Sequence, residues 1–183
     1  HETLGLPKSI TATTGMDALT HAVEAYIGNS TTKETREMAE EAVSLIYQHL
    51  KNAYEDGRNK EARSGMLRAA YCAGVAFTKS YVGYIHAVAH SLGGQYGTPH
   101  GLANAVILPI VLRMYGSACW KKLAQLARKA GVVEQGLSDE ETAKCFIDWI
   151  QEMNDSMEIP RHFPQIRRKD IPVMARHADK EGN

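Results

Sequence analysis

Apolar residues recur at helical spacing along most of the chain. Between residues 31 and 57 they stand three and four positions apart, on one face of a helix, which predicts a long amphipathic helix. The apolar positions of this segment are Met38, Ala42, Leu45, Ile46, Leu50 and Ala53. We expect a capping box from Thr31 to Glu34 to start this helix and Gly57 to end it.

Four further segments are predicted to be helical. Residues 123–130 carry one apolar stripe that ends at Gly131, and residues 143–153 carry another that follows a Ser138-x-x-Glu141 capping pattern. Residues 69–77 read AAYCAGVAF and are small or apolar on all sides, so we expect them to form the buried central helix of a bundle. Residues 166–178 are expected to form one more short helix before a charged tail.

No alternating pattern of useful length indicates a strand. Residues 105–112 are apolar enough for a buried strand, but Pro109 cannot donate a hydrogen bond in a sheet, and we interpret the segment as a kinked or broken helix. The chain shows no internal repeat and no Gly/Ser linker. It is therefore predicted to be one all-α domain, a multi-helix bundle over residues 1–183.

Charge and hydropathy narrow the possible classes of function. The chain has 21 Lys and Arg residues against 21 Asp and Glu residues, and this balance offers no field that would hold a nucleic-acid backbone or an anionic membrane. The longest apolar run, residues 103–112, contains Asn104 and Pro109 and is too short to span a bilayer. We therefore expect neither nucleic acid nor a membrane as a partner.

The cysteines and the first residues bear on cellular context. Cys72, Cys119 and Cys145 are odd in number and widely spaced, which favours buried thiols in a reducing compartment over a disulfide framework. A cytoplasmic location is the resulting expectation. The chain starts at His1 without an initiating Met or a signal peptide, and we interpret it as a piece excised from a larger protein.

Four of the eight histidines stand in two short segments, GMDALTHAVEAY and GYIHAVAHSLGGQYGTPHG. On a helix, Asp17 and His21 project from the same face one turn apart, and His86 and His90 repeat this spacing. Glycine and proline residues after His90 allow the chain to turn and to bring His100 back toward the same place. Imidazoles and a carboxylate suit divalent iron or zinc, and the candidates outnumber the ligands that a four-coordinate site needs.

Each of these pairs also has an ordinary structural explanation. An Asp and a His four residues apart often form an ion pair or a cap, and two histidines in an Ala-rich segment can be core residues that satisfy their hydrogen bonds. The joint occurrence of both pairs favours a metal site. Surface or capping roles are assigned to the other histidines, His1, His49, His162 and His177.

The segments GMDALTHAVEAY and HAVAHSLGGQYGTPHGLANAVILP resemble the two signature segments of the iron-dependent (group III) alcohol dehydrogenases. Residues 4–7 and Thr14-Gly15 resemble the start of that family's second domain, and the resemblance extends to about Gly131. It implies an all-α fold, the helical second domain of a dehydroquinate-synthase-like or iron alcohol dehydrogenase protein.

The resemblance also implies roles for particular residues. The family's metal ligands correspond to Asp17, His21, His86 and His100, and His90 corresponds to a position that faces the nicotinamide and the substrate and assists proton transfer. The implied cofactors are Fe²⁺, with Zn²⁺ as the alternative, and NAD or NADP. The implied reaction interconverts a small primary alcohol and its aldehyde. Because no ligand position is substituted, the sequence does not resemble a metal-free relative such as the maleylacetate reductases.

One part of the family pattern is missing. Its members carry an N-terminal α/β domain with a glycine-rich phosphate-binding loop, whereas this chain has no such loop, and we interpret Gly93-Gly94 as a helix end. We therefore expect a fragment whose partner is the absent nucleotide-binding domain. The fragment is not expected to turn over substrate by itself, and the full-length protein is expected to be a homo-oligomer. A metal-dependent hydrolase and a non-catalytic helical interaction module remain as alternatives.

Overall fold

The computed structural model describes residues 3–80 and 83–181, and every regular element in these ranges is helical. The all-α prediction is confirmed. The elements are α1 (Lys8–Ile27), α2 (Lys33–Glu55), α3 (Lys60–Thr78), α4 (Tyr84–Tyr96), α5 (His100–Tyr115), α6 (Ser117–Lys129), α7 (Asp139–Ser156), the 3₁₀ turn η1 (Arg168–Asp170) and α8 (Ile171–Glu181). None of the helices in the described ranges is both long and apolar enough to cross a bilayer.

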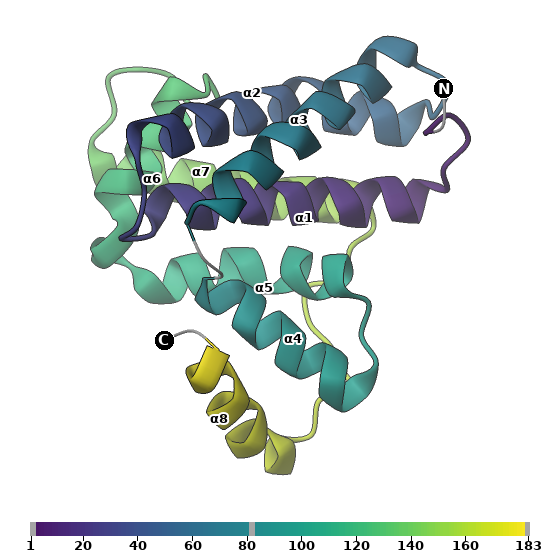
Figure 1. Cartoon of the computed structure of the whole chain (residues 1–183), viewed down its shortest axis with the longest axis vertical. Coiled ribbons are helices and arrows are strands. Elements are labelled where there is room, and N and C mark those ends of the chain that lie inside the picture. The colour runs from purple at the N-terminus through teal and green to yellow at the C-terminus, as the bar shows by residue number, and fades with distance from the viewer. Residues whose placement is uncertain (1–2, 81–82, 182–183) are drawn as a thin grey trace.

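The central helix is α1. It contacts α2, α3, α5 and α6, and it runs between the α2/α3 pair above and α5 and α4 below (Figure 1). The expectation that residues 69–77 form the central helix is wrong, because they belong to α3, on which Tyr71 is 70% exposed. Small residues such as Ala and Gly are tolerated both in a core and in water, so an Ala-rich segment does not by itself indicate burial on all sides.

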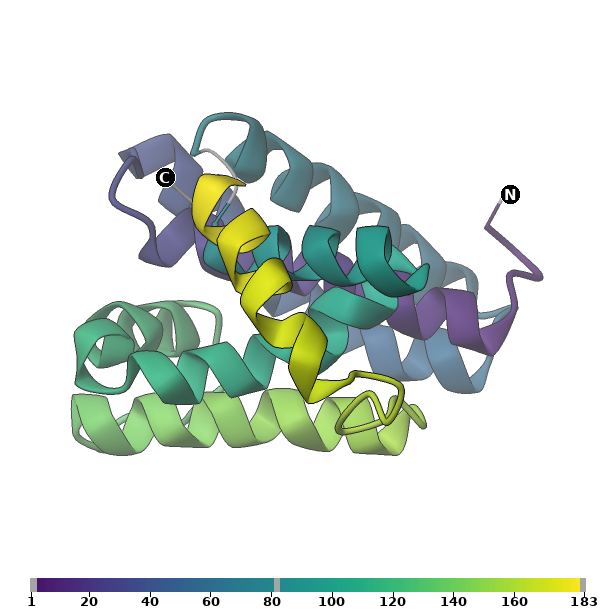
Figure 2. The ribbon, with the colours of Figure 1, turned by 90° about the horizontal axis from the view of Figure 1, so that it is seen from below.

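The remaining helices form two flanking groups. α6 packs on α7 beside the central layer, and α4 packs on both α5 and α8. In the view from below, α8 crosses over α4 (Figure 2). The helix predicted over residues 166–178 starts later than expected, at Ile171 after the η1 turn. The two one-faced helices predicted over residues 123–130 and 143–153 are confirmed as parts of α6 and α7.

Residues 105–112 are helical and not a strand, as predicted, and of the two alternatives, a kinked or a broken helix, the broken one is wrong because α5 continues through Pro109. A proline cannot donate to the carbonyl four residues earlier, which leaves the carbonyl of Ala105 without its helical partner. The buried side chain of Asn154 on α7 supplies the missing donor, with Nδ2 2.6 Å from the Ala105 oxygen. A partner from a neighbouring helix therefore makes the proline tolerable.

The ends of α4 and α2 differ from the expectations. Gly93-Gly94 lies within α4, and the helix ends at Gly97, whose φ of 64° favours glycine. The predicted capping box from Thr31 to Glu34 is wrong, because the N-cap of α2 is Thr32, whose side chain accepts from the backbone N–H of Thr35. Since adjacent threonines carry the same chemistry, the pattern alone could not separate them.

Two smaller expectations also need correction. Cys72 and Cys119 are buried as expected, but Cys145 is exposed on the outer side of α7. His49 is half-buried with its ring over Gly65, where an added Cβ would stand 2.2 Å from His49 Cδ2, so it has a packing role at the α2/α3 crossing. His162 and His177 are exposed as expected, and His1 lies outside the described residues.

The predicted capping box at the start of α7 is confirmed. Ser138 Oγ accepts from the backbone N–H of Glu141, and the Glu141 carboxylate accepts from the backbone N–H of Ser138 at 3.0 Å. The Glu141 carboxylate also accepts from the Ser138 hydroxyl at 2.8 Å, and the hydrogen bonds that it accepts from the backbone N–H and from the hydroxyl of Ser138 lower the pKa of Glu141.

We expect Ser138→Ala to lower the free energy of unfolding by about 1 kcal/mol, because the substitution leaves an N-terminal donor of α7 without its partner. Urea denaturation of the two chains would measure the difference. A matched Ser117→Ala substitution at the start of α6, a helix without a side-chain cap, should cost much less, and equal losses would contradict the capping role.

Candidate metal centre

One helix presents the first half of the site. Asp17, His21 and Glu24 lie on α1 at spacings of four and three residues, which places their side chains on one face of the helix. α5 packs against α1, and the contacts of these side chains described below come from α4 and α5. The central position of α1 therefore directs ionisable groups into the interior of the domain.

A turn between two helices presents the second half. His86 and His90 lie one turn apart on α4. After α4 ends at Gly97, Pro99 occupies the N-cap of α5 and His100 is the first residue of that helix. The left-handed Gly97 and the fixed φ of Pro99 reverse the chain within a few residues. His100 thereby returns to the helix face that carries His86.

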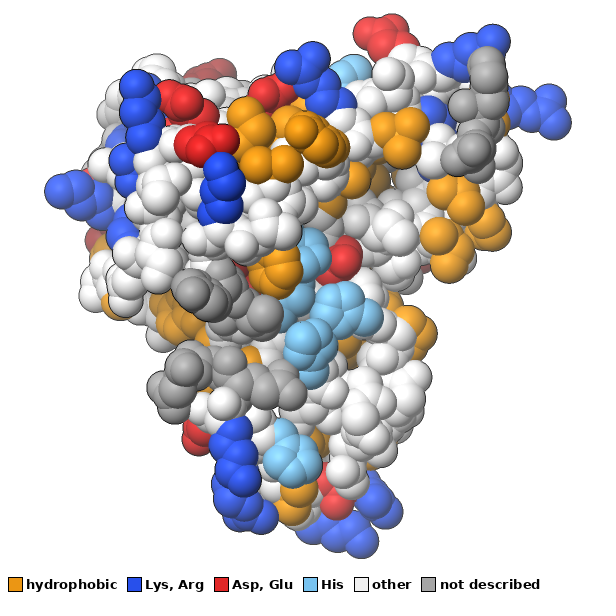
Figure 3. All heavy atoms as spheres, in the orientation of Figure 1, with side chains coloured by type: hydrophobic (Ala, Val, Ile, Leu, Met, Phe, Trp, Pro, Cys, Tyr) orange, Lys and Arg blue, Asp and Glu red, His pale blue; other side chains and the backbone are white. Residues whose placement is uncertain are grey.

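Four side chains from these three helices converge. Asp17, His21, His86 and His100 each offer a nitrogen or oxygen atom, and these atoms all lie within 4.8 Å of one another. The Asp17 carboxylate is at the centre, 3.5 Å from His21 Nε2, 3.8 Å from His86 Nε2 and 3.4 Å from His100 Nε2. Histidine side chains gather beside an acidic one in the middle of one face of the molecule (Figure 3).

The nitrogen atoms of this cluster are incompletely satisfied. His86 is 1% exposed, and its Nε2 atom has no hydrogen-bond partner among the described residues. A buried polar atom without a partner costs about 1–3 kcal/mol. The unpaired nitrogen lies against a carboxylate and two further imidazoles, so a divalent cation that accepts nitrogen and oxygen ligands fits the donor set.

Asn104 connects two members of the cluster. Its Nδ2 atom donates to Asp17 Oδ1 at 2.6 Å and lies 3.0 Å from His100 Nε2. Asn104 is fully buried on α5, one turn after His100. The amide therefore contacts the same lone pairs that a cation would use, and it holds the Asp17 carboxylate in place.

The electrostatic setting favours the protonation states that metal ligands need. Burial raises the pKa of Asp17, but the hydrogen bonds from His21 and Asn104 and the nearby imidazoles outweigh burial, so the net pKa lies below its usual value. Burial lowers the pKa of His100, and His86, His90 and His21 lower it further against the opposing effect of Asp17. An ionised carboxylate and a neutral imidazole can both donate lone pairs to a cation.

His90 lies beside the four-residue group. It is exposed, its ring stacks on that of His100 with 5.1 Å between centroids, and it stands 6.3 Å from the His86 ring. Of the five candidates found in the sequence, the structure thus brings four together and places the fifth at the solvent side.

The sequence reasoning missed Glu24 and Asn104. Glu24 is 6% exposed, and its Oε2 atom lies 2.5 Å from His86 Nδ1. A signal for it was present, because Glu24 follows Asp17 by seven residues and His21 by three on an otherwise apolar stretch of helix. Asn104 has the corresponding signal, four residues after His100.

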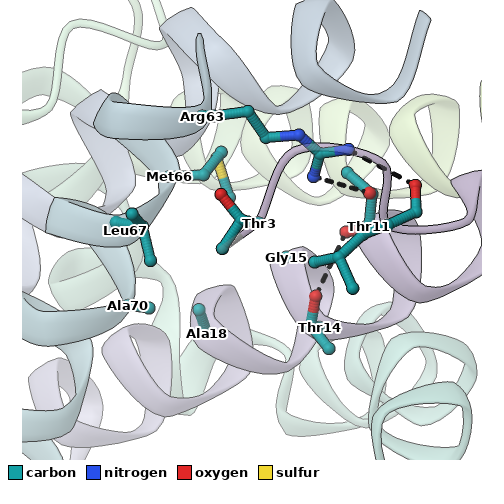
Figure 4. Close-up of a pocket in the computed structure, with 10 residues that line it drawn as sticks. Thr3, Thr11, Thr14, Gly15, Ala18, Arg63, Met66, Leu67 and Ala70 are labelled. Atoms are coloured by element: carbon teal, nitrogen blue, oxygen red, sulfur yellow. Dashed lines mark hydrogen bonds between the residues drawn. The ribbon is translucent and has the colours of Figure 1, made fainter. Parts of the chain in front are cut away.

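A separate cavity of about 110 Å³ lies on another face of α1, between α1 and α3 (Figure 4). The buried Arg63 guanidinium lines it and donates to Thr11 Oγ1 at 2.8 Å, to the Gly57 carbonyl at 3.1 Å and to the Leu6 carbonyl at 3.5 Å. Its described lining residues include neither histidine nor carboxylate. Arg63 therefore links residue 6 to α1 and α3 by hydrogen bonds. The cavity is separate from the Asp17/His21/His86/His100 cluster.

Comparison with known proteins places the chain. Residues 11–183 match the Fe-containing alcohol dehydrogenase family, C-terminal. The chain is 43% identical over 182 residues to a 1,3-propanediol dehydrogenase of Citrobacter freundii, which covers 98% of this chain and 47% of the relative. The chain spans about half the length of the curated relatives it matches.

Solved structures agree in fold. A 1,3-propanediol oxidoreductase superposes with a TM-score of 0.93 at 43% identity, over 98% of this chain and 48% of that one. A sulfoacetaldehyde reductase from Bifidobacterium kashiwanohense in complex with NAD⁺ superposes with a TM-score of 0.85 at 26% identity, over 96% of this chain and 45% of that one. The chain belongs to the Fe-containing alcohol dehydrogenase family and corresponds to its C-terminal, helical domain.

Proposed function

We propose that the chain is the metal-binding helical part of an NAD- or NADP-linked alcohol dehydrogenase that interconverts a small primary alcohol and its aldehyde. Asp17, His21, His86 and His100 hold the metal ion. The observation that carries this proposal is the convergence of four ligand atoms within 4.8 Å, one of which, His86 Nε2, is buried without a partner. An ordinary ion pair would not leave that nitrogen bare.

The donor set supports divalent iron, with zinc as the alternative. Three imidazoles and one carboxylate suit both metals, and the three cysteines lie outside the cluster, so no thiolate is available to select a softer ion. Membership of an Fe-containing family favours iron. Two of the four ligands have a supporting hydrogen-bond partner, because Asn104 donates to Asp17 and Glu24 contacts His86.

A divalent ion bound there supplies a Lewis acid, which stabilises negative charge on the oxygen of the alcohol or aldehyde. The chain's own residues orient the substrate oxygen and supply a proton to it. The Asp17 carboxylate and the neutral imidazoles define the position of positive charge, and the exposed His90, stacked on His100, holds a proton at the solvent side. An imidazole in that place is suited to passing a proton to or from the substrate oxygen.

The nicotinamide cofactor is proposed to be held mainly outside this chain. The relative crystallised with NAD⁺ is about twice as long as this chain, which supports a dinucleotide site shared with a second domain. The relatives differ in substrate, since one is a 1,3-propanediol dehydrogenase and another a sulfoacetaldehyde reductase. We therefore propose a substrate class, small alcohols and aldehydes, and not one compound.

Metal titration of the purified chain tests the proposal. After removal of bound metal with a chelator, we expect the chain to bind about one Fe²⁺ or Zn²⁺ ion, measured anaerobically by calorimetry and elemental analysis. A free metal concentration about 100 times the Kd should add about 2.7 kcal/mol to the free energy of unfolding. Mg²⁺ serves as the control and should bind weakly, since it prefers oxygen ligands.

Three outcomes would contradict parts of the proposal. A tight site would be filled after reconstitution. Retention of less than about a tenth of a metal ion per chain would therefore favour a non-catalytic interaction module. Esterase or phosphatase activity of the metal-loaded chain, without any effect of nicotinamide cofactors, would favour a hydrolase. Efficient oxidation of 1,3-propanediol by this chain alone with NAD would show that the cofactor site is not shared with another domain.

A further inference from the structure

The carboxylate of Glu24 makes two contacts across the junction between α1 and α4. Its Oε1 atom accepts from the backbone N–H of Ile85 at 2.7 Å, and its Oε2 atom lies 2.5 Å from Nδ1 of His86. Glu24 is 6% exposed and His86 is 1% exposed. Two oxygen atoms of one buried side chain thus contact two consecutive residues of another helix.

These contacts supply what the start of α4 lacks. The N-cap of α4 is Gly83, which has no side chain to accept from the free N–H groups of the first turn. Glu24 reaches one of these groups, the N–H of Ile85, from α1, and a negative charge at a helix N-terminus is favourable with respect to the helix dipole. The buried carboxylate is therefore stabilised where it stands.

The same contacts determine which nitrogen of His86 carries the proton. An ionised carboxylate can only accept hydrogen bonds, and Oε1 is already engaged by a backbone donor. His86 Nδ1 must therefore carry the hydrogen, which leaves the lone pair on Nε2. That nitrogen is the one that faces Asp17 and has no partner.

Gly83 is shaped to this carboxylate. A Cβ atom added at Gly83 would stand 2.3 Å from Glu24 Oε1 and 2.5 Å from Glu24 Cδ. The backbone of Gly83 is extended, with φ of −87°, so a larger residue would displace the Glu24 carboxylate without straining the backbone. Gly83 before α4 and Glu24 on α1 therefore depend on each other: the carboxylate occupies the space that a side chain at Gly83 would take.

We propose that Glu24 is a positioning residue that fixes His86 in the tautomer with a bare Nε2 atom, and that Gly83 leaves the space this requires. The proposal rests on the metal site described under the proposed function. It concerns the orientation of one candidate ligand, and Glu24 is not one of the four residues whose ligand atoms converge.

Glu24→Gln is the sharpest test because it keeps the shape and removes one acceptor. A glutamine can accept from Ile85 N–H only by turning its amide nitrogen toward His86, which then favours hydrogen on Nε2. We expect metal affinity to fall about 10- to 100-fold, the range for lost partners of metal-binding histidines. Glu40→Gln, which alters a half-buried carboxylate that accepts from Tyr26, is the matched control and should bind as the unaltered chain does.

Gly83→Ala tests the same arrangement without changing any polar group. The added methyl group displaces the Glu24 carboxylate, so affinity should fall about tenfold or more. Gly94→Ala is the control on the same helix, where an added Cβ meets nothing within 4 Å. Circular dichroism of all variants verifies that the helices are retained.

A second readout does not depend on metal. Nitrogen-15 NMR of the metal-free chain, recorded under conditions where the His86 ring is neutral, should show hydrogen on Nδ1 of His86 in the unaltered chain and on Nε2 in Glu24→Gln. Equal metal affinities of the two chains, or the same tautomer in both, would overturn the proposal. A tautomer change in a chain that binds no metal would support the role of Glu24 and overturn the proposed metal site.

Discussion

Replacing His86 with alanine should lower the affinity for a divalent metal by more than about 100-fold, beyond the loss expected from an outer partner. His86 contributes the most buried ligand atom of the cluster, and its Nε2 atom is the one without another partner. With three ligands left, two of them half-buried and one exposed, the remaining site is wetter and less complete. Chelator competition with Co²⁺ or Zn²⁺ would measure the difference, and Asp17→Ala should behave in the same way.

His90→Ala is the matched comparison, since it removes an imidazole one turn away on the same helix. Because His90 stands outside the group within 4.8 Å, we expect metal affinity to stay within about threefold, well below the loss from a missing ligand partner. In a full-length enzyme the same substitution should slow turnover. Equal metal loss in the His86 and His90 variants would mean that His90 is itself a ligand.

Gly101→Ala should have the largest effect of any single added methyl group near the site. A Cβ atom at Gly101 would stand 2.7 Å from the backbone oxygen of Thr13 and 3.1 Å from its carbonyl carbon. Because the obstacle is backbone, α1 and α5 would have to separate, which costs about 1–3 kcal/mol of stability. The shift would also move the adjacent His100 away from Asp17 and weaken metal binding, since ligand positions tolerate only about 0.5 Å of displacement.

Gly74→Ala supplies the control for this prediction. Gly74 lies within α3, and an added Cβ there meets nothing within 4 Å. The substitution should raise the free energy of unfolding by about 0.5–1 kcal/mol, the usual gain from Gly to Ala inside a helix. Urea denaturation of both variants would decide, and a Gly101→Ala chain as stable as the unaltered one would contradict the tight crossing.

The helices were predictable from the sequence because each has its own periodic pattern. The one-faced stripes of α2, α6 and α7 contrast apolar and charged positions strongly, so their existence and their buried faces follow from spacing alone. The central position of α1 could not be derived from spacing. Its buried face includes Thr20 and Glu24, which satisfy their hydrogen bonds locally or across helices, and such pairing is invisible in a one-dimensional pattern.

Helix spacing and the turn residues before His100 identified the candidate ligands, and the family resemblance, not spacing, set His90 apart from the other four. Spacing on a helix places Asp17 near His21 and His86 near His90, but only the turn at Gly97 and Pro99 determines that His100, and not His90, meets the others. Glu24 required knowledge that α4 starts without a cap of its own. Residues that act between helices are thus the ones that single-helix reasoning does not detect.

The hydrogen bond from Asn154 to the Ala105 carbonyl has a consequence for the order of folding. Because Pro109 removes one rung of the α5 ladder, that turn is complete only after α7 has docked, although the two helices are separated by α6 in the chain. His100 is at the start of α5 and Asn154 near the end of α7. Backbone opening at residue 105 is therefore coupled to loosening of α7.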